Sequence, residues 1–107
     1  MKTNRYIIVF VTARNKAEGR MIANGLLEDK LIACANLIKG VESFFCWKGK
    51  VDRSKEVMLV IKTQQELFSQ VVAKVKKLHS YETPEIIAFP IVAGDKAYLK
   101  WIDESVS

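Results

Sequence analysis

Cysteine, histidine and proline are scarce in this sequence. Its 107 residues include two cysteines, Cys34 and Cys46, two prolines and one histidine, His79. Two cysteines without a CxxC spacing exclude a disulfide framework and are typical of free thiols in a reducing compartment. We therefore expect the protein to be cytoplasmic.

Long hydrophobic runs and low-complexity segments are also missing. The longest apolar stretches, residues 6–11 and 57–61, are far shorter than the roughly 20 residues that cross a bilayer. Residues 1–5 lead into a stretch too short for a signal peptide. Half of the residues are hydrophobic, which argues against disorder. We expect one domain over residues 1–107, with no membrane partner and no internal repeat.

Acidic residues are outnumbered by basic ones, but the excess is spread along the chain. There are 17 Lys and Arg against 12 Asp and Glu, a formal net charge of +5. A concentrated basic face would indicate a nucleic-acid partner, whereas these lysines are interleaved with glutamate and aspartate, as on an ordinary solvated surface. We expect no nucleic-acid interface.

Hydrophobic periodicity predicts an α+β fold. Strands are expected at residues 6–12, 31–47, 51–63 and 86–92, with a bulge or bend at Gly40 and either an edge position or a bulge for the strand that contains Pro90. The order βαββαβ plus a C-terminal helix implies a four-stranded antiparallel sheet with both main helices on one face, a ferredoxin-like architecture.

Two capping-box spacings predict where the main helices begin. Asn15 is followed by Glu18, and Thr63 is followed by Glu66. The first helix is expected to end near Asp29, and Gly94-Asp95 opens the last one. The apolar positions expected to face the core are Ala17, Met21, Ile22, Leu26 and Leu27 in the first helix, Leu67, Phe68, Val71, Val72, Val75 and Leu78 in the second, and Tyr98, Leu99, Trp101 and Ile102 in the last.

The segment at residues 31–63 predicts a long hairpin arm that turns at residues 48–50. Its outgoing half would reach on the order of 55 Å, although a compact chain of this length has a radius of gyration of about 13 Å. The tip carries Phe44, Phe45 and Trp47, which would promote aggregation unless another chain covers them. The sheet face opposite the helices poses the same problem, so we expect an obligate oligomer with closed symmetry.

Five short motifs occur in an order and spacing that identify a family. They are Ala33-Cys34-Ala35-Asn36, Trp47-Lys48-Gly49, Lys62-Thr63, His79-Ser80-Tyr81-Glu82-Thr83-Pro84 and Tyr98-Leu99-Lys100-Trp101. Along essentially its whole length, the chain resembles the CutA family of divalent-cation tolerance proteins. The resemblance implies a ferredoxin-like subunit in a tight homotrimer similar to the trimeric PII signal proteins. It also implies the bacterial cytoplasm and a link to copper and other divalent metals.

His79 is the natural centre of a metal hypothesis, because imidazole is the commonest ligand for copper and zinc. Glu85 lies near the same loop and Cys34 could approach from the second strand, so the candidate ligands of copper or another divalent cation are His79, Glu85 and Cys34. The alternative is that His79 ends the second helix with its side chain near the last carbonyls.

The sequence departs from the CutA pattern at four positions. Some members carry Cys where this chain has Val11 and a second His where it has Leu78, positions associated with copper binding, and neither Val nor Leu can ligate. The loop usually reads His-Pro-Tyr; here Ser80 replaces the proline and frees a backbone donor. Cys46 stands where an aromatic residue is common.

A cleft between subunits is a second candidate site. Lys62 follows a buried strand, so it should pair with a carboxylate, Glu85 or Glu56, unless a bound anion supplies the charge. The residues expected to line the cleft are Trp47, Lys62, Tyr81, Glu82, Glu85 and Trp101. Alternatively, both tryptophans belong to the core of the trimer.

These features predict a non-enzymatic trimer involved in divalent-metal tolerance, which acts by binding a metal or small ligand. The alternative is a PII-like small-molecule sensor that uses the intersubunit cleft. An enzyme is disfavoured because no base and nucleophile occur at motif spacing and no glycine-rich phosphate loop appears. RNA binding is disfavoured because the third strand, residues 56–62, has no aromatic side chain on which a base could stack.

Overall fold

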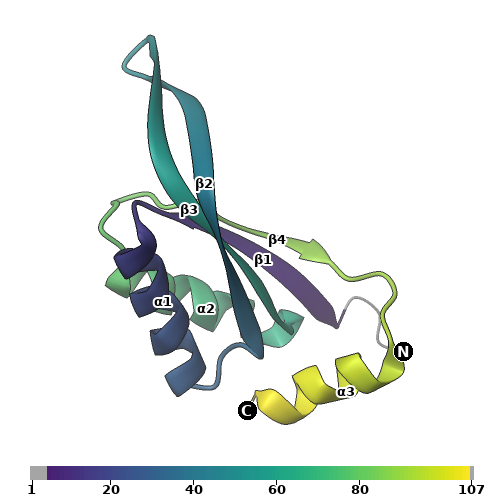
Figure 1. Cartoon of the computed structure of the whole chain (residues 1–107). Coiled ribbons are helices and arrows are strands. Elements are labelled where there is room, and N and C mark those ends of the chain that lie inside the picture. Colours follow the sequence, from purple (N-terminus) through teal and green to yellow (C-terminus); the bar gives the residue numbers. More distant parts are fainter. Residues whose placement is uncertain (1–4, 107) are drawn as a thin grey trace.

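The computed structural model describes residues 5–106, which form a four-stranded antiparallel sheet and three α-helices (Figure 1). The elements are β1 (Tyr6–Ala13), α1 (Lys16–Glu28), β2 (Cys34–Trp47), β3 (Lys50–Gln64), the 3₁₀ helix η1 (Gln65–Leu67), α2 (Phe68–Leu78), β4 (Ile86–Pro90) and α3 (Lys96–Ser105). The strand order is β2-β3-β1-β4. This arrangement confirms the predicted ferredoxin-like α+β fold, with β4 at an edge as Pro90 indicated.

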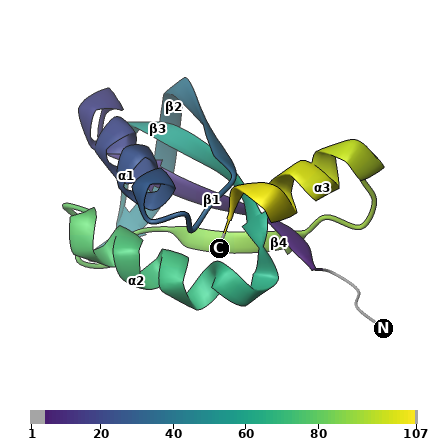
Figure 2. The same ribbon diagram turned by 90° about the horizontal axis from the view of Figure 1, so that it is seen from below.

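Helices α1 and α2 lie side by side on one face of the sheet (Figures 1 and 2). The core forms beneath them because successive strand residues point to opposite faces, so alternate residues are buried in β1 and in residues 57–63 of β3. The fully buried side chains here include Val9, Val11, Ile22, Leu26, Leu59, Ile61, Val71 and Val75. None of the helices has the length and apolar character of a membrane span over the part of the chain that the structure describes.

Helix α1 begins as predicted but buries a narrower stripe. Asn15 caps it, since its Oδ1 accepts a hydrogen bond of 2.9 Å from the Glu18 N–H. Met21 and Leu27 are 46% and 41% exposed, and Ala17 is exposed as well, so the expected five-residue stripe was too wide. Buried Gly19 explains how close the helix lies to the sheet: a Cβ there would be 3.0 Å from the side chains of Leu37 and Val57.

The capping box predicted at Thr63 and Glu66 is wrong. Strand β3 continues to Gln64, so Thr63 is part of the sheet and fully buried. Its hydroxyl donates to the Leu31 carbonyl at 2.6 Å and therefore caps no helix. Gln64 precedes η1 and makes no capping hydrogen bond through its side chain, and α2 follows from Phe68.

The hairpin of β2 and β3 has the predicted bulge and turn. The register passes from Ile38 opposite Met58 to Val41 opposite Glu56, with Gly40 at a φ of 78°. Lys48 and Gly49, at φ values of 51° and 79°, join the directly paired Trp47 and Lys50 in a two-residue turn of the primed type.

The arm projects from the rest of the subunit but is shorter than expected (Figure 1). The whole chain extends 46 × 26 × 23 Å, so an outgoing strand of 55 Å is wrong. Residues 31–33 are not part of β2, which begins at Cys34, and the bulge shortens the strand further. At the tip, Phe44, Phe45 and Trp47 are 64%, 43% and 61% exposed.

Helix α3 lies at the end of the sheet away from the arm tip (Figure 1). Asp95 caps it by accepting from the Tyr98 N–H at 3.1 Å, and Ile102 is its buried anchor. Asp103 accepts hydrogen bonds from the Tyr6 hydroxyl at 2.7 Å and the Gln64 amide at 2.6 Å. The expected burial of Tyr98 and Trp101 is wrong for a single subunit, in which each is 42% exposed.

Candidate functional site

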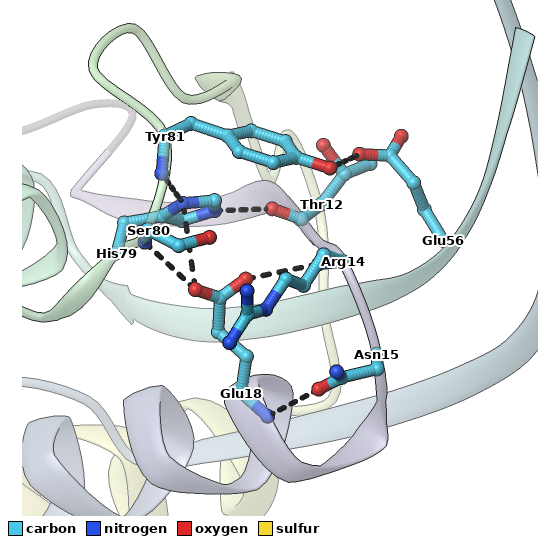
Figure 3. A network of polar contacts seen from close by, with 8 residues as sticks. All are labelled: Thr12, Arg14, Asn15, Glu18, Glu56, His79, Ser80 and Tyr81. Carbon is cyan, nitrogen blue, oxygen red and sulfur yellow. Dashed lines mark hydrogen bonds and ion pairs between the residues drawn. The ribbon is translucent and has the colours of Figure 1, made fainter.

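His79 lies in a buried polar cluster where α2, β1 and α1 meet (Figure 3). It ends α2 with its N–H bonded to the Val75 carbonyl at 2.8 Å. Its Nε2 is 2.7 Å from the Thr12 carbonyl oxygen, and its Nδ1 is 3.0 Å from the Tyr81 amide nitrogen. A carbonyl can only accept and an amide N–H can only donate, so Nε2 carries the proton, Nδ1 is an acceptor and the ring is neutral.

Glu18 fixes the loop that follows His79. Its Oε1 accepts from the Arg14 N–H at 2.9 Å, and its Oε2 accepts from the Ser80 N–H at 2.7 Å (Figure 3). Burial, the largest single influence, raises the pKa of Glu18, but the hydrogen bonds from Arg14 and Ser80 outweigh it and leave the pKa lowered. The donor freed by Ser80, where the family's loop has proline, is therefore used by a buried carboxylate.

Tyr81 joins this loop to the base of the hairpin arm. Its hydroxyl donates to Glu56 Oε2 at 2.8 Å, and Ser43 donates to Glu56 Oε1 at 2.6 Å. Burial first, and then the bond to Glu56, raise the pKa of Tyr81. The Tyr81 ring also lies against the His79 imidazole, with ring centroids 4.7 Å apart. The cluster is thus fully hydrogen-bonded and holds α1, β1, β3 and the loop in one arrangement.

The predicted metal ligands do not meet within one subunit. Among residues 5–106 there is no group of three His, Cys, Asp or Glu side chains that could hold a metal ion. Both ring nitrogens of His79 are engaged, Glu85 is exposed, and Cys34 contacts the Tyr98 hydroxyl at 3.5 Å. The site of His79, Glu85 and Cys34 is therefore wrong for a single subunit. The alternative is partly right: His79 ends α2, but its ring bonds to β1 and not to the last helical carbonyls.

The predicted cleft residues lie in three separate places along the subunit. Trp47 is at the arm tip, Tyr81 is at the arm base beside Glu56, and Lys62 lies six residues further along β3, roughly 20 Å away at the rise of a strand. Trp101 stacks near Tyr98, with ring centroids 5.5 Å apart, and a hydrogen bond with Cys34 raises the pKa of Tyr98 to about 12. Glu82 is exposed.

Lys62 does not pair with either expected carboxylate. Its ammonium group donates to the Asn36 side-chain oxygen and, at 3.4 Å, to the Val60 carbonyl. Glu56, the nearer candidate in sequence, is already bound by Tyr81 and Ser43. Over the described residues, Lys62 thus has only neutral acceptors.

The second notable surface is the sheet face opposite α1 and α2, which we call the open face. Phe10 of β1 and Phe89 of β4 pack there with ring centroids 5.1 Å apart. On the same face, Ile38, Ile87 and Phe89 are 49%, 45% and 47% exposed. The open face is therefore an apolar surface that one subunit leaves in contact with water.

Sequence reasoning missed the cluster residues Thr12, Glu18 as a buried carboxylate, and Ser43. Thr12 and Ser43 gave no usable signal, because one contributes only a backbone carbonyl and the other is a single hydroxyl in a strand. Glu18 did give one: it lies one turn before Ile22, on the face that packs against the sheet. An acidic residue in that position must find donors when the helix packs.

The sequence and the fold of this chain are similar to those of known proteins. The family model described as CutA1 divalent ion tolerance protein matches residues 7–105. The divalent-cation tolerance protein CutA of Archaeoglobus fulgidus is 45% identical over 98 residues, which cover 92% of this chain and 95% of that protein. The crystal structure of CutA1 from Oryza sativa matches with a TM-score of 0.95 and 40% identity, covering 98% of this chain and 96% of that one.

One plant relative is considerably longer. The chloroplastic protein CutA of Arabidopsis thaliana is 41% identical over 104 residues, which are 97% of this chain but 57% of that protein. The chain thus spans a little more than half of this relative. Because the family model covers nearly the whole chain, and the identities and the fold agree with it, the chain belongs to the CutA1 divalent ion tolerance family.

Proposed function

We propose that this chain acts as a homotrimer in tolerance of divalent metal ions, copper among them, and that it works by binding a metal or small ligand between subunits and not by catalysis. The open face is the observation that carries the proposal. On this face, Ile87 and Phe89 are exposed to water beside the unpaired edge of β4. At the arm tip, Phe44 and Trp47 are exposed to water as well. A second copy of the chain can cover both surfaces.

Assembly would also account for the scattered positions of the candidate ligands. One subunit separates Trp47, Tyr81 and Lys62 along the length of the arm and β3. A neighbouring subunit seated on the open face can bring its own residues to each of these places. Copper would be expected near Cys34, because thiolates are good copper ligands. The His79 ring would bind copper only after breaking its hydrogen bond with Thr12 or with Tyr81.

Lys62 supports the alternative function, a PII-like sensor of a small molecule. Its ammonium group bonds only to the neutral oxygens of Asn36 and Val60 among the described residues. An anionic effector held between subunits would supply the missing negative charge. In this case Lys62→Gln should abolish effector binding and leave copper binding unchanged.

We further propose a cytoplasmic location, supported by the two free thiols of Cys34 and Cys46. An Arabidopsis relative is named chloroplastic, so location differs between members of the family. Fractionation of the source cells, with detection of the protein by antibody, tests this point. Recovery outside the cytoplasmic fraction would contradict it.

Native mass spectrometry after incubation with a small excess of copper tests assembly and metal binding together. The expected result is a trimer that keeps stoichiometric copper through buffer exchange, and that loses it in Cys34→Ser but keeps it in the matched control Cys46→Ser. A monomer would overturn the trimer. A trimer that releases all copper would overturn the copper site and leave the small-molecule sensor.

A further inference from the structure

An open groove of about 490 Å³ lies where the start of α1 meets the bulge in the hairpin arm. It is lined by Arg14, Asn15, Lys16, Lys39, Gly40, Val41, Glu42, Lys55, Glu56 and Val57. These residues come from three separate segments of the chain: the β1–α1 connection, β2 and β3. We call it the basic groove, because four of the lining residues are Lys or Arg and two are Glu.

The positive charges of the basic groove have no carboxylate partners. Within residues 5–106, no ion pair joins Arg14, Lys16, Lys39 or Lys55 to an acidic side chain. Lysines elsewhere do have partners: Lys74 lies 3.0 Å from Asp29 and Lys100 lies 3.9 Å from Glu104. Other cations of the described residues, such as Lys76 and Lys77, are unpaired as well, but these four surround a concave surface, which strengthens their field.

The two acids of the groove are already occupied. Glu56 accepts hydrogen bonds from Tyr81 and Ser43 through its two oxygens. Glu42 lies 3.7 Å from the guanidinium group of Arg53, outside the groove lining. Neither carboxylate pairs with the four cations, and the two negative charges reduce the formal charge of the lining from +4 to +2, which still favours a negatively charged ligand.

The backbone around the groove is held in place. The Arg14 N–H is bonded to Glu18, and the Asn15 side chain caps α1, whose positive end faces this region. Gly40 has a φ of 78° and no heavy atom within 4 Å of the position of a Cβ, so the bulge leaves room for a ligand to approach the backbone. A preorganised groove loses less entropy when it binds a ligand.

From this geometry we infer that the basic groove binds the polyphosphate group of a small molecule. Several adjacent negative charges match four cations that converge from three segments. The lining contains no aromatic side chain on which a base could stack. The groove therefore recognises only the phosphates, whether they belong to free inorganic polyphosphate or to a nucleotide. This site uses neither Cys34 nor Lys62, so it is independent of the function proposed above.

Isothermal titration of the full chain with inorganic tripolyphosphate, in the absence of metal, tests the inference. We expect saturable binding that Lys39→Gln with Lys55→Gln weakens about tenfold. The matched control is Lys76→Gln with Lys77→Gln, which removes the same charge from exposed positions of α2 outside the groove. It should change the affinity by less than about twofold.

A second titration with ATP distinguishes the two sources of the phosphates. Because no aromatic residue lines the groove, ATP should bind no more tightly than tripolyphosphate. Tighter binding of ATP would overturn recognition by phosphates alone. Equal losses in the two lysine pairs would show attraction to the net charge of the chain, and the absence of saturable tripolyphosphate binding would overturn the site itself.

Discussion

The two faces of the sheet carry similar side chains and differ in what covers them. Under α1 and α2, Leu59 and Ile61 are fully buried, whereas Ile87 and Phe89 on the open face are 45% and 47% exposed. The strands are shared, so the same alternation of residues produces both surfaces. The covered face stabilises the subunit, and the open face is available for assembly. Changes to the two faces should therefore fail in different ways.

The largest effect is expected from a charge on the open face. Phe89→Asp would place a carboxylate in the apolar interface and should abolish the trimer, leaving monomer or aggregate in native mass spectrometry. Met21→Asp is the matched control, since Met21 on α1 is 46% exposed and Phe89 is 47% exposed. If both variants assembled normally, the open face would not be the interface.

A cavity on the covered face should act on stability. Leu59→Ala removes a fully buried side chain and should lower the free energy of unfolding by about 3 kcal/mol per subunit in a denaturant titration. Val51→Ala in the same strand, 80% exposed, should change it by less than about 0.5 kcal/mol. Similar losses of stability in both variants would mean that the exposure of a side chain in one subunit does not predict its burial in the assembled protein.

Replacing Glu18, a buried polar residue of α1 on the covered face, should also lower stability. Glu18→Gln turns an acceptor into an amide that faces a backbone donor, so it should cost roughly 2 kcal/mol and leave assembly unchanged. The folded-state pKa of Glu18 is lowered, so its stabilisation is present above its unfolded pKa of about 4.3 and is lost as the pH falls through the folded value.

The pH dependence of stability provides the measurement. Unfolding titrations between pH 7 and pH 3 should show a smaller loss of stability on acidification in Glu18→Gln than in the unchanged chain. Part of the loss of stability should persist in this variant, because the pKa of Asp103 is lowered as well. The hydrogen bond from the Tyr6 hydroxyl is the main cause; burial opposes it, and Gln64 and Arg5 add to it. An unchanged pH profile would show that folding does not shift the pKa of Glu18.

The smallest effect is expected at Ser80. Ser80→Pro removes the N–H that Glu18 accepts and should lower stability by about 1 kcal/mol while raising the pKa of Glu18. His79, with φ −78° and ψ 144°, already has the conformation that a following proline requires. Ser80→Ala keeps the N–H and is the control; equal stability of the two variants would mean that the hydrogen bond contributes nothing.

Much of the fold was predictable because its signals are local. Apolar runs rich in β-branched residues identified β1 and β3, Gly40 marked the bulge, and the Lys48-Gly49 turn lies where the strands require positive φ. The second capping box failed for a non-local reason: the Thr63 hydroxyl bonds to Leu31, a residue 32 positions away. A spacing of three residues cannot reveal such a competitor.

The candidate site was predicted less well than the fold. His79 was correctly singled out, but its ring is bound by Thr12, 67 positions away, and by Tyr81, which leaves no free lone pair for a metal. Lys62 was expected beside a carboxylate and contacts Asn36 instead. Side-chain partners are chosen among all the groups that the fold brings within hydrogen-bond distance, and periodicity describes burial only.

The sequence by itself determined the order of the elements, the two-faced sheet, the turn and bulge of the arm, and membership of the CutA1 family, because these depend on backbone preferences and on residue type at short spacing. Only the tertiary structure decided that His79 is neutral and fully bonded, that Ser80 supplies a donor to buried Glu18, and that unpaired cations from three segments converge on one groove. The physical reason is range: hydrogen bonds and ion pairs act over about 3–4 Å between atoms, and folding alone brings distant residues that close.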